Sequence, residues 1–261
     1  MEDRDSARAA KHSSSLTEAL DVRSVGFTPI KGARHLSQSD ADFDERGPVG
    51  DRRYCLVDVE KRQVLRTVQN PSLVAVFARL HDDHLETRLP DGRSVSAVPE
   101  VSGETLTCDY WGRPVEAELT DGPHDGLLSA WLGKSVRLAR VPRGDVVYGD
   151  PVSIVATASI RDLGRKVDHP DLLAEAARFR ATFLIDTEEP FVEETWAGRE
   201  VSLGGVRVRI GETIPRCAVM DLDPVTGARG PRLLKSLAAY RGSNANGEPF
   251  FGTYAQVVGE S

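Results

Sequence analysis

Short apolar segments separated by frequent turn signals are the feature that most limits what this chain can fold into. Glycine- and proline-bearing turns, such as those at residues 90–92 and 111–114, interrupt the first half of the sequence at short intervals. Strands of this length and spacing are typical of a β-barrel or a sandwich, whereas a βαβ array places a helix between successive strands. The candidate strands cover residues 22–27, 53–59, 73–80, 85–89, 105–108 and 115–118.

The second half of the sequence combines strands with a few helices, and a polar stretch at 142–151 separates it from the first half. We therefore expect a mainly β fold with a few helices, in three parts: a disordered leader over 1–20, a β-barrel-like domain over 21–141 and a second β-rich domain over 150–261. Helices are expected at 125–132, 159–165, 172–180 and 231–240, and strands at 136–141, 152–156, 182–186, 201–203, 206–210, 217–222 and 254–258.

Composition argues against several classes of function. The 261 residues carry a net charge of −7, which disfavours nucleic acid and anionic membranes as general partners. The sequence contains no apolar run of about 18 residues, so no transmembrane helix is expected. The polar, serine-rich leader lacks the apolar segment of a secretory signal. Three cysteines, an odd number, do not suit a disulfide framework, and we therefore expect a cytoplasmic protein.

Cys217 has the most informative surroundings of the three cysteines. It follows Pro215 and Arg216 at the end of an alternating apolar run. A neighbouring guanidinium favours the thiolate, which acts either as a nucleophile or as a soft metal ligand. A small buried apolar residue is the competing interpretation, and the pattern alone leaves both open. Cys55 and Cys108 lie in strand-like segments with aromatic and aliphatic neighbours, so we expect them to pack in the core.

Several cations occur at positions where they could converge on one anionic ligand. Taken singly, each of them is more typical of a solvated surface cation or an ion-pair partner than of a ligand-binding residue. Arginine pairs of this kind suit phosphate, because the planar guanidinium can donate two parallel hydrogen bonds. No phosphate-binding glycine motif is present, so a nucleotide site is not indicated. The candidate cofactor-binding cations are Lys31, Arg52, Arg53, Arg178 and Arg180, with Arg216 beside the thiol.

Several segments occur together in an order and spacing that are specific as a set. They include Phe27–Gly32, Gly50–Val57, Arg178–Arg180, Pro215–Cys217 and Asp223–Gly227. In these segments the chain resembles MOSC-domain proteins with an N-terminal MOSC β-barrel domain, a group that includes the mitochondrial amidoxime-reducing component and related bacterial reductases. The resemblance covers nearly all of residues 21–258. It implies an N-terminal MOSC β-barrel-like domain over 21–141, packed on a C-terminal MOSC β-barrel domain over 150–261.

The resemblance also implies a molybdenum cofactor, a molybdopterin, in a cleft between the domains. Cys217 would be the catalytic metal ligand and Arg216 would favour its thiolate. The pterin phosphate and dithiolene arm would be held by the cations matching Lys31, Arg52, Arg178 and Arg180. The implied reaction is the reduction of N-hydroxylated small molecules, with electrons from a separate donor protein.

The chain departs from the family pattern at several cofactor-type positions. Val68 stands where the family has an arginine, Ala181 and Thr182 replace a proline and an asparagine, and Glu212 replaces a lysine. These departures keep two alternatives open. The first is a metal-free enzyme that uses Cys217 as a nucleophile or sulfur carrier in carbon–sulfur bond chemistry or sulfur transfer. The second is a non-catalytic carrier of a cofactor or of sulfur.

Overall fold

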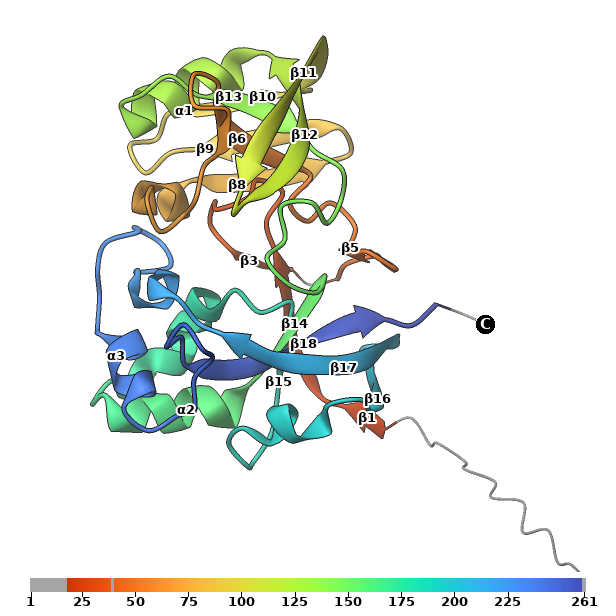
Figure 1. Cartoon of the computed structure of the whole chain (residues 1–261), viewed down its shortest axis with the longest axis vertical. Helices are drawn as coiled ribbons and strands as arrows, with labels where there is room; N and C mark the ends of the chain where they lie inside the picture. The colour runs from red at the N-terminus through yellow and green to blue at the C-terminus, as the bar shows by residue number, and fades with distance from the viewer. Residues whose placement is uncertain (1–17, 39, 260–261) are drawn as a thin grey trace, which may run out of the picture.

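A closed five-stranded barrel forms the centre of the N-terminal half in the computed structural model, which describes residues 18–38 and 40–259 (Figure 1). Its interior is filled by alternating side chains that include Cys55, Cys108 and Tyr110. The burial of both cysteines confirms that they pack in the core. In barrel order the strands are β11 (Glu100–Tyr110), β12 (Arg113–Asp121), β13 (Arg137–Arg140), β6 (Tyr54–Asp58) and β7 (Gln63–Val64).

A small antiparallel sheet and one helix cover the barrel on its outer side. The sheet contains β8 (Phe77–His81), β9 (His84–Arg88) and β10 (Ser94–Ala97), and the helix is α1 (Pro123–Leu132). Residues of these elements share one hydrophobic cluster with the outward-facing side chains of the barrel, such as Leu56 and Leu138. A two-stranded ribbon of β4 (Phe43–Asp44) and β5 (Gly47–Pro48) lies apart from them.

An eight-stranded sheet organises the rest of the molecule and lies below the barrel in Figure 1. Its central strands, over 152–156 and 183–185, are buried on both faces and read as nearly continuous apolar runs, whereas the strand over 206–215 alternates between buried and exposed side chains. Along β14, Ile154 and Ala156 point into one cluster and Val155 into the other. In sheet order the strands are β1 (Glu18–Leu20), β16 (Glu200–Leu203), β17 (Val206–Pro215), β18 (Phe250–Val257), β14 (Val152–Ala156), β15 (Phe183–Ile185), β2 (Val22–Phe27) and β3 (Leu36–Gln38).

The sheet includes residues that the sequence analysis placed elsewhere. Glu18–Leu20, expected in the leader, form β1 and pair in parallel with β16. The remainder of the leader, residues 1–17, lies outside the described residues. The strands β2 and β3 fall within the range expected for the first domain, yet they pair with β15 and with each other at the edge of the large sheet. Residues 18–38 therefore contribute strands to the large sheet, although they lie on the N-terminal side of the domain boundary that sequence composition indicates at 142–151.

Helices cover one face of the large sheet through the cluster that contains Ile160, Phe179 and Phe251. No helix among the described residues is long and apolar enough to cross a membrane. The helices of this half are α2 (Thr157–Lys166), η2 (Pro170–Phe179), η3 (Val192–Trp196), η4 (Ala218–Asp221) and α3 (Leu233–Ala238).

Two expected strands have a different conformation. The segment expected as a strand over 73–80 begins as a short 3-10 helix, η1 (Pro71–Ala75), and only its second part forms β8. The segment expected as a strand over 217–222 forms η4, with Met220 buried under the helical layer. Short apolar runs fit a buried helical turn as well as a strand, and tertiary packing decides between them.

Direct contacts join the two halves of the molecule. Arg34 donates one amino group to the backbone oxygens of Ala75, at 3.0 Å, and Val225, at 2.8 Å. Gly227 has a left-handed φ of 71°, and a side chain there would collide with the backbone oxygen of Pro71. These contacts hold the loop that follows η4 against the N-terminal half, so that the residues around Cys217 face those around Lys31.

Candidate functional site

A cleft between the two halves brings most of the predicted site residues together. Lys31 enters it from the turn after β2, and Arg52 enters it from the turn before β6. Arg178 and Arg180 reach it from the end of η2, and Arg216 and Cys217 from the end of β17. Residues far apart in the sequence thus form one cationic surface around a thiol.

Cys217 lies at a change of backbone conformation. The strand β17 continues to Pro215, and the amide of Arg216 still donates to the backbone oxygen of Pro249 at 2.8 Å. Cys217 is still extended, with φ −119° and ψ 176°, and is the residue directly before η4. Its side chain is exposed, in contrast to the other two cysteines. An accessible thiol on the cleft wall is therefore available as a ligand or nucleophile.

Arg216 is locked in place beside this thiol. Its Nε donates to the oxygen of Phe251 and its Nη1 to the oxygen of Phe179, both at 2.8 Å. Its Nη2 is buried and has no hydrogen-bond partner among the described residues. Burial lowers the pKa of Arg216 to about 10, although Tyr254 and Cys217 oppose the shift. The guanidinium thus remains charged at neutral pH with one donor free.

The side chains of Lys31 and Arg180 lie in an environment that disfavours positive charge. Burial, followed by the charges of Arg180 and Arg52, lowers the pKa of Lys31 to about 7. Burial and the charge of Arg52 lower the pKa of Arg180 to about 10. The Lys31 ammonium lies 5.1 Å from the centre of the Tyr110 ring, and within the described residues no carboxylate pairs with it. An anion bound among these groups would reverse the unfavourable electrostatics.

The other two cations of the cleft are partly neutralised. Arg52 forms an ion pair with the buried carboxylate of Asp51. Arg178 is buried, forms an ion pair with Glu175 and donates to the backbone oxygen of Leu222. Arg178 therefore also holds the segment after η4 in position.

Some of the non-glycine residues with a left-handed backbone conformation lie in the same region. Arg52, Trp111 and Arg180 all line the cleft and have φ values of 45°, 57° and 51°. Left-handed φ is unfavourable for residues with bulky side chains and persists where the surrounding structure enforces it. Such residues commonly occur at binding sites, which supports a functional role for the cleft.

One predicted site residue lies elsewhere. Arg53 does not line the cleft; it lies 3.6 Å from Asp83 and over the ring of Tyr54. Arg52 has a left-handed φ of 45° in the turn before β6, and this turn directs the side chain of Arg52 into the cleft and that of Arg53 away from it. Its inclusion among the cofactor-binding residues is therefore not supported by its position.

Several cleft residues were missed by the sequence analysis. They are Arg66, Tyr110, Trp111, Tyr148 and Tyr254. Val68, where the family has an arginine, also lines the cleft, and the guanidinium of Arg66 lies in the same wall. Of these residues, Trp111 could have been singled out from the sequence, because small or polar residues are usual in a two-residue turn and a bulky tryptophan is not.

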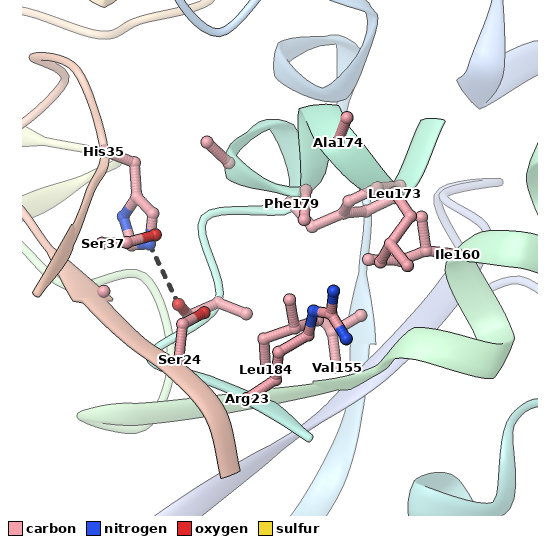
Figure 2. A pocket seen from close by; sticks show the side chains of 14 residues that line it. Arg23, Ser24, His35, Ser37, Val155, Ile160, Leu173, Ala174, Phe179 and Leu184 are labelled. Carbon is pink, nitrogen blue, oxygen red and sulfur yellow. Dashed lines mark hydrogen bonds between the residues drawn. The ribbon is translucent and has the colours of Figure 1, made fainter. Parts of the chain in front are cut away.

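A second pocket lies between η2 and the strands β2 and β3, as Figure 2 shows. Its walls are mostly apolar, with contributions from Ile160, Leu173 and Leu184. The buried His35 donates from Nε2 to the oxygen of Ala181 at 3.0 Å (Figure 2). Burial holds the pKa of His35 well below its usual value, so this imidazole is neutral. The pocket contains no thiol, and the cleft around Cys217 remains the better candidate site.

The side chains of the described residues do not form a chelating site for a metal ion. Across residues 18–38 and 40–259, no group of three or more His, Cys, Asp and Glu side chains could hold an ion.

Curated relatives fall into two groups. Mitochondrial amidoxime reducing component 2 of Rattus norvegicus is 29% identical over 278 residues, which cover 93% of this chain and 80% of that protein. Molybdenum cofactor sulfurase of Caenorhabditis elegans is 24% identical over 220 residues, which cover 82% of this chain. The chain spans only 30% of that sulfurase. A protein from Bordetella bronchiseptica, solved in solution, matches 44% of this chain with 16% identity and a TM-score of 0.30.

Two family models together match the described chain almost from end to end. The MOSC N-terminal beta barrel domain matches residues 19–135, and the MOSC domain matches residues 132–261. The N-terminal five-stranded barrel and the mainly β architecture agree with the fold that the resemblance implied, and the strands of the second half lie in an eight-stranded sheet with β1 and β3 at its edges. The chain belongs to the family of MOSC-domain proteins that carry the MOSC N-terminal β-barrel domain.

Proposed function

We propose that this protein is a molybdenum-cofactor-dependent oxidoreductase that reduces N-hydroxylated small molecules, with Cys217 as the metal ligand. The observation that carries the proposal is an exposed thiol in a cleft lined by cations that lack sufficient anionic partners. The similarity to amidoxime reducing components over most of both chains supports the reaction class.

The cleft suits an anionic cofactor. A phosphate group near Lys31 and Arg180 would offset the burial and the repulsion between cations that lower the pKa of both side chains. The free Nη2 of Arg216 would gain an acceptor. Arg52 and Arg178 would add charge-assisted hydrogen bonds along the same wall. Cys217 would contribute one soft sulfur ligand, and the dithiolene arm of the cofactor would contribute others.

When bound, the molybdenum cofactor would supply the two-electron redox chemistry. The overall reaction converts an N–OH group into N–H, taking up two electrons and two protons and releasing water. We propose that the electrons come from a separate donor protein and the protons from solvent. The chain's own residues would hold the cofactor and orient the small-molecule substrate toward Cys217. We propose the cytoplasm as the compartment.

Metal analysis tests the proposal directly. Protein expressed with molybdate should contain close to stoichiometric molybdenum, and the Cys217→Ser variant should lose the reduction of N-hydroxylated substrates. Arg52→Gln should lower the molybdenum content, whereas Arg53→Gln, which removes the neighbouring cation outside the cleft, should retain it. A well-folded wild-type protein without molybdenum would refute the proposal.

Sulfur transfer is a second candidate function. The exposure of Cys217, together with the similarity to a segment of molybdenum cofactor sulfurases, favours it. In this case the Cys217 thiolate would attack the outer sulfur of a donor persulfide; the donor's S–S bond would break, the donor would leave as a thiolate, and the sulfur would stay on Cys217 as a persulfide for later sulfur transfer or carbon–sulfur bond chemistry. Mass spectrometry that detects a persulfide on Cys217 in protein free of molybdenum would favour this candidate over the reductase. A pure carrier would show the persulfide but no turnover.

A further inference from the structure

Two exposed aromatic side chains line the cleft that contains Cys217. Trp111 is 47% exposed and Tyr148 is 54% exposed, and the two rings meet edge to face with their centres 6.0 Å apart. Both belong to the same cleft wall as Val68, a third exposed apolar side chain. Because exposed rings contribute little to folding, their gathering at the thiol-bearing cleft requires another explanation.

The backbone at Trp111 adds to the cost of exposing this ring. Tyr110 pairs with Arg113, so Trp111 and Gly112 form a two-residue turn between β11 and β12. Both turn residues have positive φ, 57° and 78°. Such turns favour Asn, Asp or Gly at the first position, and a tryptophan there is strained. The indole of Trp111 is thus placed at the cleft despite the local backbone strain.

Neighbouring groups hold the indole in one orientation. The guanidinium of Arg66 lies 4.2 Å from the centre of the Trp111 ring and donates to a carboxylate oxygen of Asp109 at 2.9 Å. Arg113 donates to the backbone oxygen of Val147 at 2.8 Å, which ties the turn to the segment that carries Tyr148. A ring fixed before binding loses little entropy when a ligand stacks on it.

We infer that Trp111 and Tyr148 form a platform that stacks against a planar aromatic ring of the substrate and selects aryl over alkyl N-hydroxylated compounds. This inference rests on the proposed function for the reaction, but the platform itself can be tested without turnover. Indole and phenol rings favour flat π-systems through offset or edge-to-face contact, which a saturated ring of equal size cannot match. An uncharged ring also avoids the repulsion that a cation would meet in this cleft.

Binding of two matched neutral probes tests the platform in the purified full-length protein. Benzamide and cyclohexanecarboxamide differ in ring planarity but not in charge, and ligand-observed NMR titration gives both dissociation constants. We expect the preference of the wild type for benzamide to fall about three- to tenfold in Trp111→Leu. The matched control is Trp131→Phe, which removes an indole that donates to the oxygen of Ser72 outside this cleft. That variant should keep the full preference.

The outcomes separate the platform from the reaction. An unchanged preference in folded Trp111→Leu overturns the platform, whatever the reaction. If that variant fails to fold, Tyr148→Leu provides the same test, because Tyr148 is exposed and lies outside the helices and strands. In cofactor-loaded Trp111→Leu enzyme, the ratio of kcat/KM for an aryl amidoxime to kcat/KM for a cyclohexyl amidoxime should fall in parallel with the binding preference. Loss of the binding preference without any amidoxime reduction by the wild type would support the platform and refute the proposed reaction.

Discussion

The buried ammonium of Lys31 should make the ligand-free protein less stable than a variant without it. The pKa of this group falls from 10.5 to about 7, chiefly because of burial and then because of Arg180 and Arg52. At about 1.4 kcal/mol per pH unit, this difference sets an upper limit of about 5 kcal/mol on the cost of the charge. Lys31 borders the cleft, where solvent reduces the cost. We therefore expect Lys31→Met to raise the free energy of unfolding by about 1–3 kcal/mol below pH 7.

The effect should depend on pH in a defined direction. Since the pKa of Lys31 is lower in the folded than in the unfolded state, the unfolded chain binds more protons between about pH 7 and 10.5. The stability of the wild type relative to Lys31→Met therefore rises across that window. Below about pH 7 both states are protonated and the penalty is complete. The advantage of the variant should thus be largest in mild acid and decline in mild base.

Urea unfolding of ligand-free protein at about pH 6 and about pH 9 measures this difference. The exposed Lys235, whose substitution by Met changes neither burial nor a cleft contact, provides the control and should show no pH-dependent difference. Inorganic phosphate should stabilise the wild type more than Lys31→Met, because the anion favours the charged amine. A stabilisation that is equal at both pH values would show that packing, not charge, is responsible and would refute the reasoning.

Three further predictions concern reactivity and folding. In the native protein iodoacetamide should modify Cys217 alone, because Cys55 and Cys108 are buried and burial raises the pKa of Cys55 to about 12. Mass spectrometry measures the number of modified cysteines, and two modified cysteines before unfolding would contradict this prediction. Glu193→Ala should cost about 3 kcal/mol in urea unfolding, because the buried carboxylate accepts hydrogen bonds from the Ala156 amide and the Ser159 hydroxyl, and a loss below about 0.5 kcal/mol would show that these bonds contribute little. Gly227→Ala should lower the melting temperature, because the left-handed φ and the adjacent backbone leave no room for a side chain; an unchanged value would mean that the loop moves without cost.

Local sequence patterns predicted most elements of the fold. The strands at 22–27 and 152–156 match β2 and β14 at both ends, and the helix expected at 125–132 matches most of α1. These segments combine an apolar pattern with turn residues at their ends, so neighbouring residues are enough to specify them. The segment at 217–222 is a short apolar run that fits a strand as well as a helical turn. Its helical conformation depends on the burial of Met220 by elements distant in the sequence.

For the site, the sequence by itself determined which chemical groups were available: one thiol beside an arginine, and a set of cations in a specific order. Only the tertiary structure decided which of them meet. Arg52 faces the cleft and Arg53 does not, because the left-handed turn at Arg52 turns its side chain inward and leaves that of Arg53 on the other side. Lys31 and Trp111 lie in the same cleft as Cys217 because packing between the halves, not sequence spacing, sets those distances.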